Sequence, residues 1–273
     1  MSLKTILCAY SGDPDRGSGL RHAIALAKRH DALLTGVAKT GGIGFLHRQM
    51  SAQLPEAIRA QLDANGRRML ADVADRFTAM TDAAGLAGRA AFVELDPKRD
   101  GPIASFARAF DLTVIGHHAA APYEDDYAAH PDLIALRSGR PVLIVPQGLG
   151  EAGVATANVM VAWDGKRAAT RAIVSAMPIL ESGASVTLLS VGHTPRNTDR
   201  LLTTLAAHGI AVQAASVEQV GSISDTLLQE ADARSADLIV MGAFEHSKFS
   251  HDVSGGATTD VLAGARMPLL MAH

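Results

Sequence analysis

Short apolar runs alternate with segments of helical periodicity along the chain. One run covers residues 4–12 (KTILCAYSG), and a similar one covers residues 158–165 (NVMVAWDG). Apolar residues three and four apart follow each run: Leu20, Ala23, Ile24 and Ala27 in one case, and Ala169, Ala172, Ile173 and Ala176 in the other. This order predicts a buried strand followed by an amphipathic helix, twice.

The later elements repeat in the same order, so the chain reads as two copies of one unit. The remaining expected strands correspond as 32–38 with 184–191, 88–95 with 210–219, 111–116 (DLTVIG) with 237–242 (DLIVMG), and 141–145 with 268–271. The fourth-strand glycine and the last-strand proline are 141 − 116 = 25 residues apart in one copy and 268 − 242 = 26 in the other. Ser222 and Asp225 have capping-box spacing, which predicts a helix start.

Strands that alternate with helices and are continuously apolar predict an α/β fold, with a doubly wound, five-stranded parallel sheet in each copy. Ligands of such sheets bind beyond the carboxyl ends of the strands, near the switch point. Asp164, Gly165 and Gly242 fall there. Residues 147–157 (QGLGEAGVATA) lack periodicity, so domains are expected at residues 1–147 and 154–273.

The first copy carries extra chain between its second and third strands. A glycine-rich turn at residues 41–44 precedes a long stretch with helical apolar spacing: Leu54, Ile58, Leu62, Met69, Val73, Phe77 and Met80. The stretch is either a lid or partner surface or a longer helix that covers the sheet. The spacing favours the covering helix, because it is that of a buried stripe.

Composition limits the function classes. The chain has 273 residues, 48% hydrophobic and 19% charged, and a net charge of −3 with both signs interspersed. This fits two globular domains and offers no basic face for nucleic acid or an anionic membrane. A single cysteine, Cys8, makes no internal disulfide and is read as a core residue. Without a secretory signal or an apolar run of roughly 18 residues, the expected location is the cytoplasm.

The segment 241–262 (MGAFEHSKFSHDVSGGATTDVL) carries the main candidate site. Its glycine at a strand end lets a ligand approach the backbone, and Gly255 and Gly256 precede a helix start whose N–H groups can face an anion. This arrangement predicts a phosphate cradle.

The segment resembles the nucleotide loop of the universal stress protein family: glycine, two residues, glycine, nine residues, glycine, then serine or threonine. Two positions depart from the pattern, because Glu245 replaces the second glycine and Gly256 replaces the hydroxyl residue. The resemblance covers nearly the whole chain. It implies a Rossmann-like fold of the adenine nucleotide alpha hydrolase type, and small cytoplasmic stress-response proteins that bind ATP or AMP. Family members pair through the last strand of each domain, which would make this chain a pseudo-dimer in itself.

The family's site residues carry over to the second copy. Asp164 matches the aspartate that faces the adenine, Val191 a pocket wall, and Gly242 and Gly255 the loop glycines. The resemblance also assigns these positions to the site: Trp163, Gly165, Glu245, His246, Ser247, Gly256 and Thr258. Thr258 would supply the hydroxyl that Gly256 lacks. Two alternatives stay open, since Asp164 also suits a turn that caps the next helix and Trp163 also suits packing.

Glu245 is the main obstacle to the binding of a nucleoside triphosphate. A carboxylate about 4 Å from a phosphate oxygen costs about 4 kcal/mol at an effective dielectric near 20, unless a cation bridges the two. Adenosine or AMP is therefore expected to bind more tightly than ATP. The first copy has Ser11 in place of the aspartate, no glycine between Gly116 and Gly139, and acidic residues at 124–126, so it is expected to bind no phosphate.

The sequence gives less support to other kinds of site. The histidines at 117–118, 246 and 251 have no known metal-ligand spacing, and no GxSxG elbow indicates a serine hydrolase. The leading hypothesis is a nucleotide-responsive regulator that acts on an unknown protein partner, with no catalytic residue assigned and with further self-association open. The alternatives are a slow Mg²⁺-dependent ATPase, in which Glu245 or Asp164 helps hold the metal, and a nucleotide-independent interaction module.

Overall fold

The computed structural model describes residues 2–10, 17–39, 55–96, 99–117, 131–149, 156–243 and 257–273. Its strands are β1 (Thr5–Ala9), β2 (Leu33–Lys39), β3 (Ala90–Leu95), β4 (Leu112–His117), β5 (Val142–Pro146), β6 (Asn158–Ala162), β7 (Ser185–Val191), β8 (Ala211–Val217), β9 (Leu238–Gly242) and β10 (Leu269–Ala272). Its helices are α1 (Gly17–His30), α3 (Glu56–Ala83), α4 (Ile103–Phe106), α5 (Pro131–Ser138), α6 (Arg167–Leu180), α7 (Thr198–Ala207), α8 (Ile223–Ala233) and α9 (Ala257–Gly264), with a short 3-10 helix, η2 (Ala107–Ala109).

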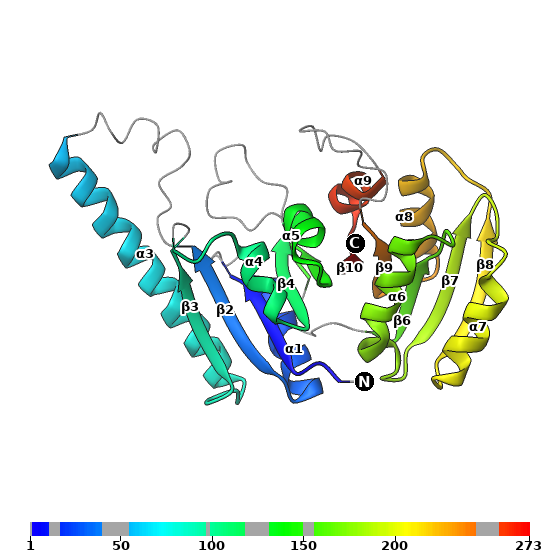
Figure 1. The fold of residues 1–273 in the computed structure, drawn as a ribbon, viewed down its shortest axis with the longest axis horizontal. Helices are drawn as coiled ribbons and strands as arrows, with labels where there is room; N and C mark the ends of the chain where they lie inside the picture. Colours follow the sequence, from blue (N-terminus) through cyan, green and yellow to red (C-terminus); the bar gives the residue numbers. More distant parts are fainter. Residues whose placement is uncertain are drawn as a thin grey trace.

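The strands form one sheet of ten in the order β3-β2-β1-β4-β5-β10-β9-β6-β7-β8 (Figure 1). Neighbours within each half run parallel. The halves meet where β5 and β10 pair antiparallel, with Leu270 opposite Leu143. This confirms the doubly wound α/β halves and the pairing of their last strands. It also shows that the two five-stranded sheets are one continuous sheet.

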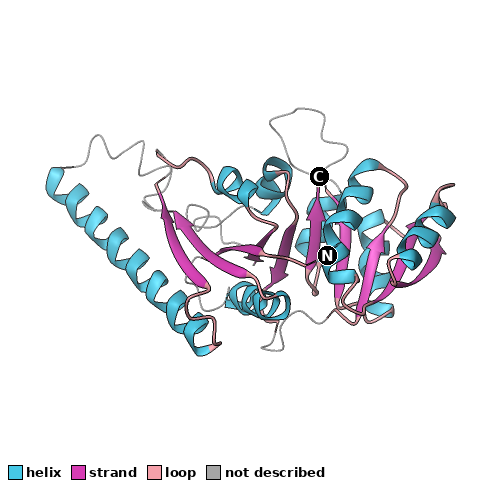
Figure 2. Ribbon diagram, turned by 60° about the horizontal axis from the view of Figure 1, so that its bottom comes forward, coloured by secondary structure: helices cyan, strands magenta, loops and turns pink. Residues whose placement is uncertain are grey.

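The core consists of two apolar layers, one on each face of the sheet. Because alternate residues of a strand point to opposite faces, Ile6 and Cys8 belong to one layer and Leu7 to the other. The first layer also contains side chains of α1, α3, α6 and α7, and the second those of α4, α5, α8 and α9. Helices lie on both sides of the sheet in Figure 2. Burial on both faces explains why the strands are continuously apolar.

The aspartate of each DLxVxG repeat fastens the start of a neighbouring strand. Asp111 Oδ2 accepts hydrogen bonds from the backbone N–H groups of Lys4 at 2.8 Å and Thr5 at 3.0 Å. In the second half, Asp237 Oδ2 accepts one from the N–H of Asn158 at 2.9 Å. Burial raises the pKa of Asp111, but the hydrogen bonds to its carboxylate outweigh it and hold that pKa below its ordinary value. The repeated aspartate therefore has a structural role in both halves.

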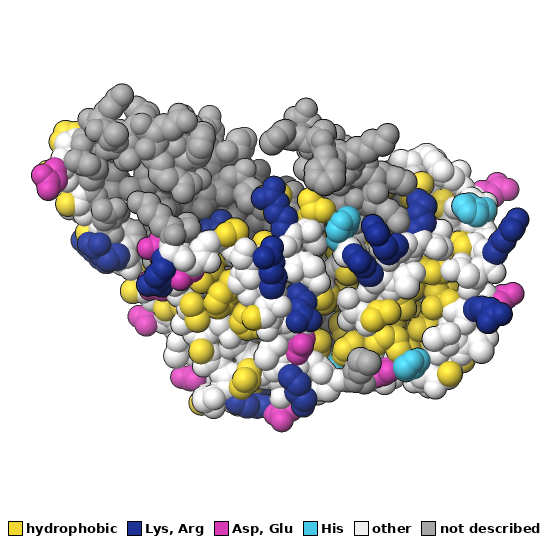
Figure 3. Space-filling model, viewed as in Figure 1, with side chains coloured by type: hydrophobic (Ala, Val, Ile, Leu, Met, Phe, Trp, Pro, Cys, Tyr) yellow, Lys and Arg dark blue, Asp and Glu magenta, His cyan; other side chains and the backbone are white. Residues whose placement is uncertain are grey.

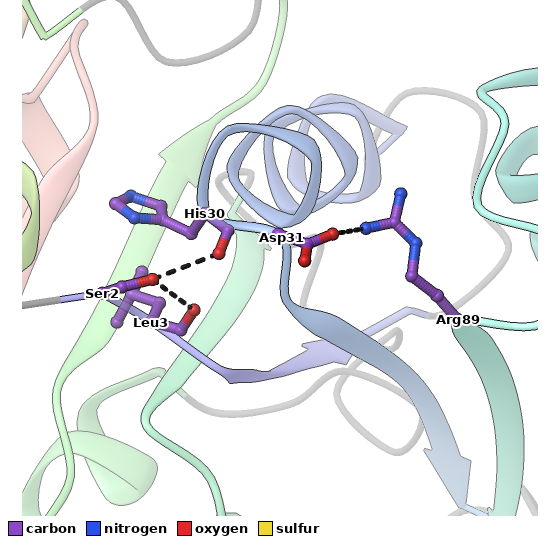
Figure 4. Close-up of polar contacts among 5 residues, drawn as sticks. All are labelled: Ser2, Leu3, His30, Asp31 and Arg89. Carbon is purple, nitrogen blue, oxygen red and sulfur yellow. Dashed lines mark hydrogen bonds and ion pairs between the residues drawn. The ribbon is translucent and has the colours of Figure 1, made fainter.

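Polar contacts also hold the end of α1 at the amino ends of β1 and β3 (Figure 4). Ser2 Oγ donates to the carbonyl of His30 at 3.1 Å, and Arg89 forms an ion pair with Asp31. Asp31 has φ 52°, in the left-handed region that aspartate tolerates better than most residues. These contacts lie at the edge opposite to the carboxyl ends of the first-half strands, and the strands of the second half point the other way because β5 and β10 pair antiparallel.

Helix α3 covers the sheet with its C-terminal half only. Phe77 is buried, and its ring lies 5.5 Å from that of Phe92 on β3. In the N-terminal half, Ile58 and Met69 are 46% and 55% exposed, and Figure 1 shows this part extending past the sheet. The covering interpretation thus holds from about Leu70 onward, whereas Ile58 and Met69 are not buried. Leu54 and the side chain of Leu62 lie outside the described part of the structure. The glycine-rich turn at residues 41–44 lies outside the described residues.

The predicted start of α8 can be compared directly with the structure, whereas the predicted domain boundary cannot. Ser222 caps α8 as predicted: its Oγ accepts from the N–H of Asp225 at 3.0 Å, and the Asp225 carboxylate accepts from the N–H of Ser222. Residues 150–155 are not described, so the domain boundary stays a prediction. Among the described helices, none is both long enough and apolar enough to span a membrane.

Candidate functional site

The candidate site lies at the switch point of the second half. Strand β6 pairs with β7 on one side and β9 on the other, so the chain winds in opposite directions from β6. The last paired residues of β6 and β9 are Val161 and Val240. Asp164 and Gly242 follow them by three and two positions, so both lie at the carboxyl-end edge, where such sheets bind ligands. Val191 ends the adjacent strand, β7, and is half-buried.

Asp164 is presented to solvent in the turn between β6 and α6. Its Oδ1 accepts a hydrogen bond from the N–H of Lys166 at 3.0 Å, and the Lys166 ammonium lies 3.6 Å from Oδ2. The side chain nevertheless remains 48% exposed. The turn part of the alternative therefore describes the local structure, but the capping part is wrong, because the N-cap of α6 is Lys166 and it has no side-chain cap bond. The Asp164 carboxylate keeps acceptor capacity for a ligand.

Trp163 lies in the core. It is 4% exposed, and its Nε1–H donates to Thr198 Oγ1 at 3.1 Å, while Thr198 Oγ1 donates to the carbonyl of Pro195 at 2.7 Å. The hydroxyl of Ser190 donates to the carbonyl of Trp163 at 3.0 Å. The packing interpretation fits this arrangement, because the indole has almost no exposed face on which a base could stack.

Gly165 and Gly242 are both required by backbone geometry. Gly165 has φ 76°, and a Cβ there would lie 2.7 Å from Pro195 Cβ. A Cβ on Gly242 would lie 2.6 Å from the backbone nitrogen of Ala169 and 2.7 Å from Ala168 Cβ, in the first turn of α6. Contacts below 3.0 Å essentially never occur for real Cβ atoms. The strand-end glycine therefore lets α6 cross the end of β9, whatever its part in ligand binding.

The first half has a glycine on both elements of the same crossing, Gly116 on the strand and Gly19 on the helix. A Cβ on Gly19 of α1 would lie 2.5 Å from the backbone nitrogen of Gly116, at the end of β4. Ser11 and the acidic residues at 124–126 lie outside the described residues. The expectation that this half binds no phosphate therefore stays a prediction.

Helix α9 follows the predicted loop. Thr258 is half-buried in the first turn of α9. Asp260 of the same helix accepts a hydrogen bond from Ser224 of α8 at 3.4 Å, and α9 packs against α8. Glu245, His246, Ser247, Gly255 and Gly256 lie outside the described residues, so their roles remain predictions. Within the ranges that the structure describes, no three His, Cys, Asp or Glu side chains come together as a metal site.

Two polar residues near the same edge were not identified from the sequence. His273 follows β10, and its Nδ1 lies 2.8 Å from the carbonyl of Ala243, directly after β9. Arg171 of α6 donates to the carbonyl of His273 at 2.9 Å. Their proximity depends on the parallel pairing of β9 with β10, and no local motif in the sequence signals it. Arg171 thereby brings a cation to His273, whose side chain contacts the backbone just after Gly242.

Part of the sequence and the whole fold are similar to those of known proteins. The sequence profile described as Universal stress protein family matches residues 196–273. A universal stress protein from Archaeoglobus fulgidus covers 99% of this chain and 96% of its own length, at 16% identity and a TM-score of 0.71. A Pseudomonas aeruginosa structure bearing the universal stress protein name covers 99% and 93%, at 15% identity and a TM-score of 0.58.

A universal stress protein in complex with cAMP covers 42% of this chain and 96% of its own length, at 20% identity and a TM-score of 0.35. No curated protein sequence matches the chain. At these identities the full-length structures establish the fold, and the sequence profile establishes the family of the segment that it matches. Residues 196–273 thus belong to the universal stress protein family, and the chain as a whole has the fold of its tandem, two-domain members.

Proposed function

We propose that the second half of the chain binds an adenine nucleotide at the carboxyl ends of β6, β7 and β9. The observation that carries the proposal is the placement of Asp164, Val191 and Gly242 at the carboxyl ends of three neighbouring strands, with the Asp164 carboxylate half exposed. An exposed acceptor beside a half-buried apolar wall suits a base that offers an N–H donor and an apolar face.

The described residues fit the base end of such a ligand better than a reacting phosphate. Asp164 is held by Lys166, which fixes its direction without neutralising its remaining acceptor capacity. The phosphates of a bound nucleotide would extend toward Arg171 and the first turn of α9, because a cation and a helix N-terminus favour an anion. We infer binding rather than turnover, because the described part of the site pairs no nucleophile with a general base.

The phosphate end decides which nucleotide is preferred. Glu245 would repel the terminal phosphates, at a cost of about 4 kcal/mol for a pair about 4 Å apart. The expected order of affinity is therefore AMP or adenosine before ATP. Bound ligand would stabilise the segment from Gly242 to Thr258, and a protein partner would read the resulting surface.

The test is a thermal-shift titration with ATP, ADP, AMP and adenosine, with and without Mg²⁺. A ligand that binds only the folded state at 100 times its Kd adds about 2.7 kcal/mol of stability. Asp164→Ala removes a charged hydrogen-bond acceptor and should weaken binding about 10- to 100-fold. The matched control is Asp232→Ala, an exposed carboxylate at the end of α8, which should leave the titration unchanged.

Each outcome has a defined meaning. A shift abolished by Asp164→Ala but kept by Asp232→Ala supports the proposed site. Equal shifts in both variants place the ligand elsewhere, and the absence of any shift favours the interaction-module alternative. ADP release that requires Mg²⁺ and is lost in Glu245→Ala would establish the ATPase alternative instead.

A further inference from the structure

One edge of the sheet lacks the usual protection against further pairing. The strand order ends at β8, the outermost strand of the second half in Figures 1 and 2. Its seven residues (AVQAASV) include no charged residue, proline or glycine. Proteins commonly block a sheet edge with charges, proline, bulges or very short strands, because an open edge can pair with another chain. Strand β8 has none of these features.

The open backbone groups of β8 can be assigned by alternation. The N–H of Gly192 donates to the carbonyl of Val217 at 2.8 Å, so Val217 directs its backbone polar groups toward β7. Backbone groups alternate sides along a strand, so those of Val212, Ala214 and Ser216 point away from β7. No strand lies beyond β8 in the sheet of the described residues. Three consecutive outward positions are therefore available for pairing.

The sequence of β8 is complementary to itself across a two-fold axis at Ala214. Antiparallel pairing would place Ala214 opposite its own copy and Val212 opposite Ser216, and each pair would exchange two hydrogen bonds. The side chains of β8 are small, apolar or, at Gln213, polar but uncharged, so no charge is desolvated and none faces a like charge. Val220 and Ile223, just beyond the end of β8, are 58% and 47% exposed and would gain cover from a neighbouring chain.

The opposite edge differs in its chemistry. Strand β3 carries a charged, exposed residue, Glu94, whereas β8 carries no charge. A helix packs on each edge strand, α3 on β3 and α7 on β8, so the difference between the two edges is the charge. The chain already joins its halves by antiparallel pairing, between β5 and β10. A second copy added at β8 would continue the same sheet by the same kind of contact.

We propose that the open edge of β8 is a dimerisation surface, on which β8 of a second copy of this chain pairs antiparallel with the two-fold axis at Ala214. The surface lies outside the nucleotide site, and the proposal does not depend on the function proposed above.

The first measurement is the mass of the full-length protein by sedimentation equilibrium over a concentration series. A species of twice the 28.4 kDa chain mass is expected, in reversible equilibrium with the single chain. Hydrogen exchange of the outward amides of Val212, Ala214 and Ser216 should slow as concentration rises. A single-chain mass throughout, or exchange at these amides independent of concentration, would overturn the proposal.

A charge-complementation pair tests the position of the axis. Ala214 is exposed, so Ala214→Lys and Ala214→Glu should both preserve the monomer fold. Each variant alone would place two like charges opposite each other and weaken the dimer about tenfold. An equimolar mixture of the two should restore association.

The matched control is Ala91→Lys in the middle of β3, where Ala91 is also exposed. This variant should associate like wild type. Dimers that persist in both Ala214 variants, or that are lost in Ala91→Lys, would refute the β8 interface. Failure of the mixture to associate would refute the two-fold register.

Discussion

Replacing Gly242 with alanine should destabilise the protein even when no ligand is present. The added Cβ would lie 2.6 Å from the backbone nitrogen of Ala169, whereas ordinary van der Waals contact begins at 3.4 Å, so α6 must retreat by about 3.4 − 2.6 = 0.8 Å. The obstacle is helix backbone, which has no rotamer to change. A gap of 0.5–1 Å forfeits about a quarter to a half of each dispersion contact that α6 makes with the sheet.

The expected loss of unfolding free energy is about 3 kcal/mol, at the upper end of the range for overpacked cores. For a chain of this size that corresponds to a fall in Tm of about 6–12 °C. Trp163, the sole tryptophan, lies just before α6, so its fluorescence is a suitable local probe in a thermal or urea denaturation.

Two glycines provide matched comparisons. Gly19→Ala in α1 meets the backbone of Gly116 at 2.5 Å and should cost a similar amount in the first half. Gly66→Ala in α3 meets no atom within 4 Å and should stabilise by about 0.5–1 kcal/mol, because alanine is the better helix former. If Gly242→Ala unfolds at the wild-type temperature and loses only ligand affinity, the glycine serves the ligand alone and the packing argument is wrong.

Three further predictions concern buried groups. Thr198→Val should cost about 1–3 kcal/mol, because it leaves the buried indole N–H of Trp163 without its acceptor; urea unfolding of the two proteins measures the difference. The pKa of Asp111 is lowered in the folded state, so its contribution to stability is complete above the ordinary carboxyl pKa and is lost as pH falls through the lowered value. Asp111→Asn should therefore reduce the loss of unfolding free energy at acid pH. An acid dependence identical to that of wild type would contradict this prediction. Burial raises the pKa of Cys8 to about 12, so an aromatic disulfide reagent should label it only after denaturation, and rapid labelling of the native protein would contradict its burial.

The sequence predicts the parts of this fold that depend on local pattern. Buried strands, the DLxVxG repeat and the Ser222 cap all follow from periodicity or short-range spacing, and the nearly equal loop lengths supported the division into two halves. The pairing of their last strands was implied by the family resemblance. Contacts that depend on tertiary approach were not predictable in this way. The crossing of α6 over Gly242 and the position of Arg171 beside His273 join residues distant in sequence, which no single-sequence pattern encodes.

Helix α3 shows a different limit of sequence analysis. Its apolar residues recur at helical spacing both before and after Leu70, but Ile58 and Met69 are exposed whereas Leu70 and Phe77 are buried. Periodicity predicts which face of a helix is apolar, whereas the length of the opposing surface decides how much of that face is buried. For the candidate site, the strand ends could be placed from the pattern, and the loop residues 244–256 remain predictions.

The joint between β5 and β10 also affects how the two halves can change over evolutionary time. In a homodimer every substitution occurs twice, so a residue cannot be altered at one site and preserved at the other. Here each half is encoded separately, and a covalent connection keeps its neighbour at high effective concentration however dilute the protein is. The first half can therefore carry Ser11 where the second carries Asp164, and can specialise as a permanent structural partner without releasing the half that it supports.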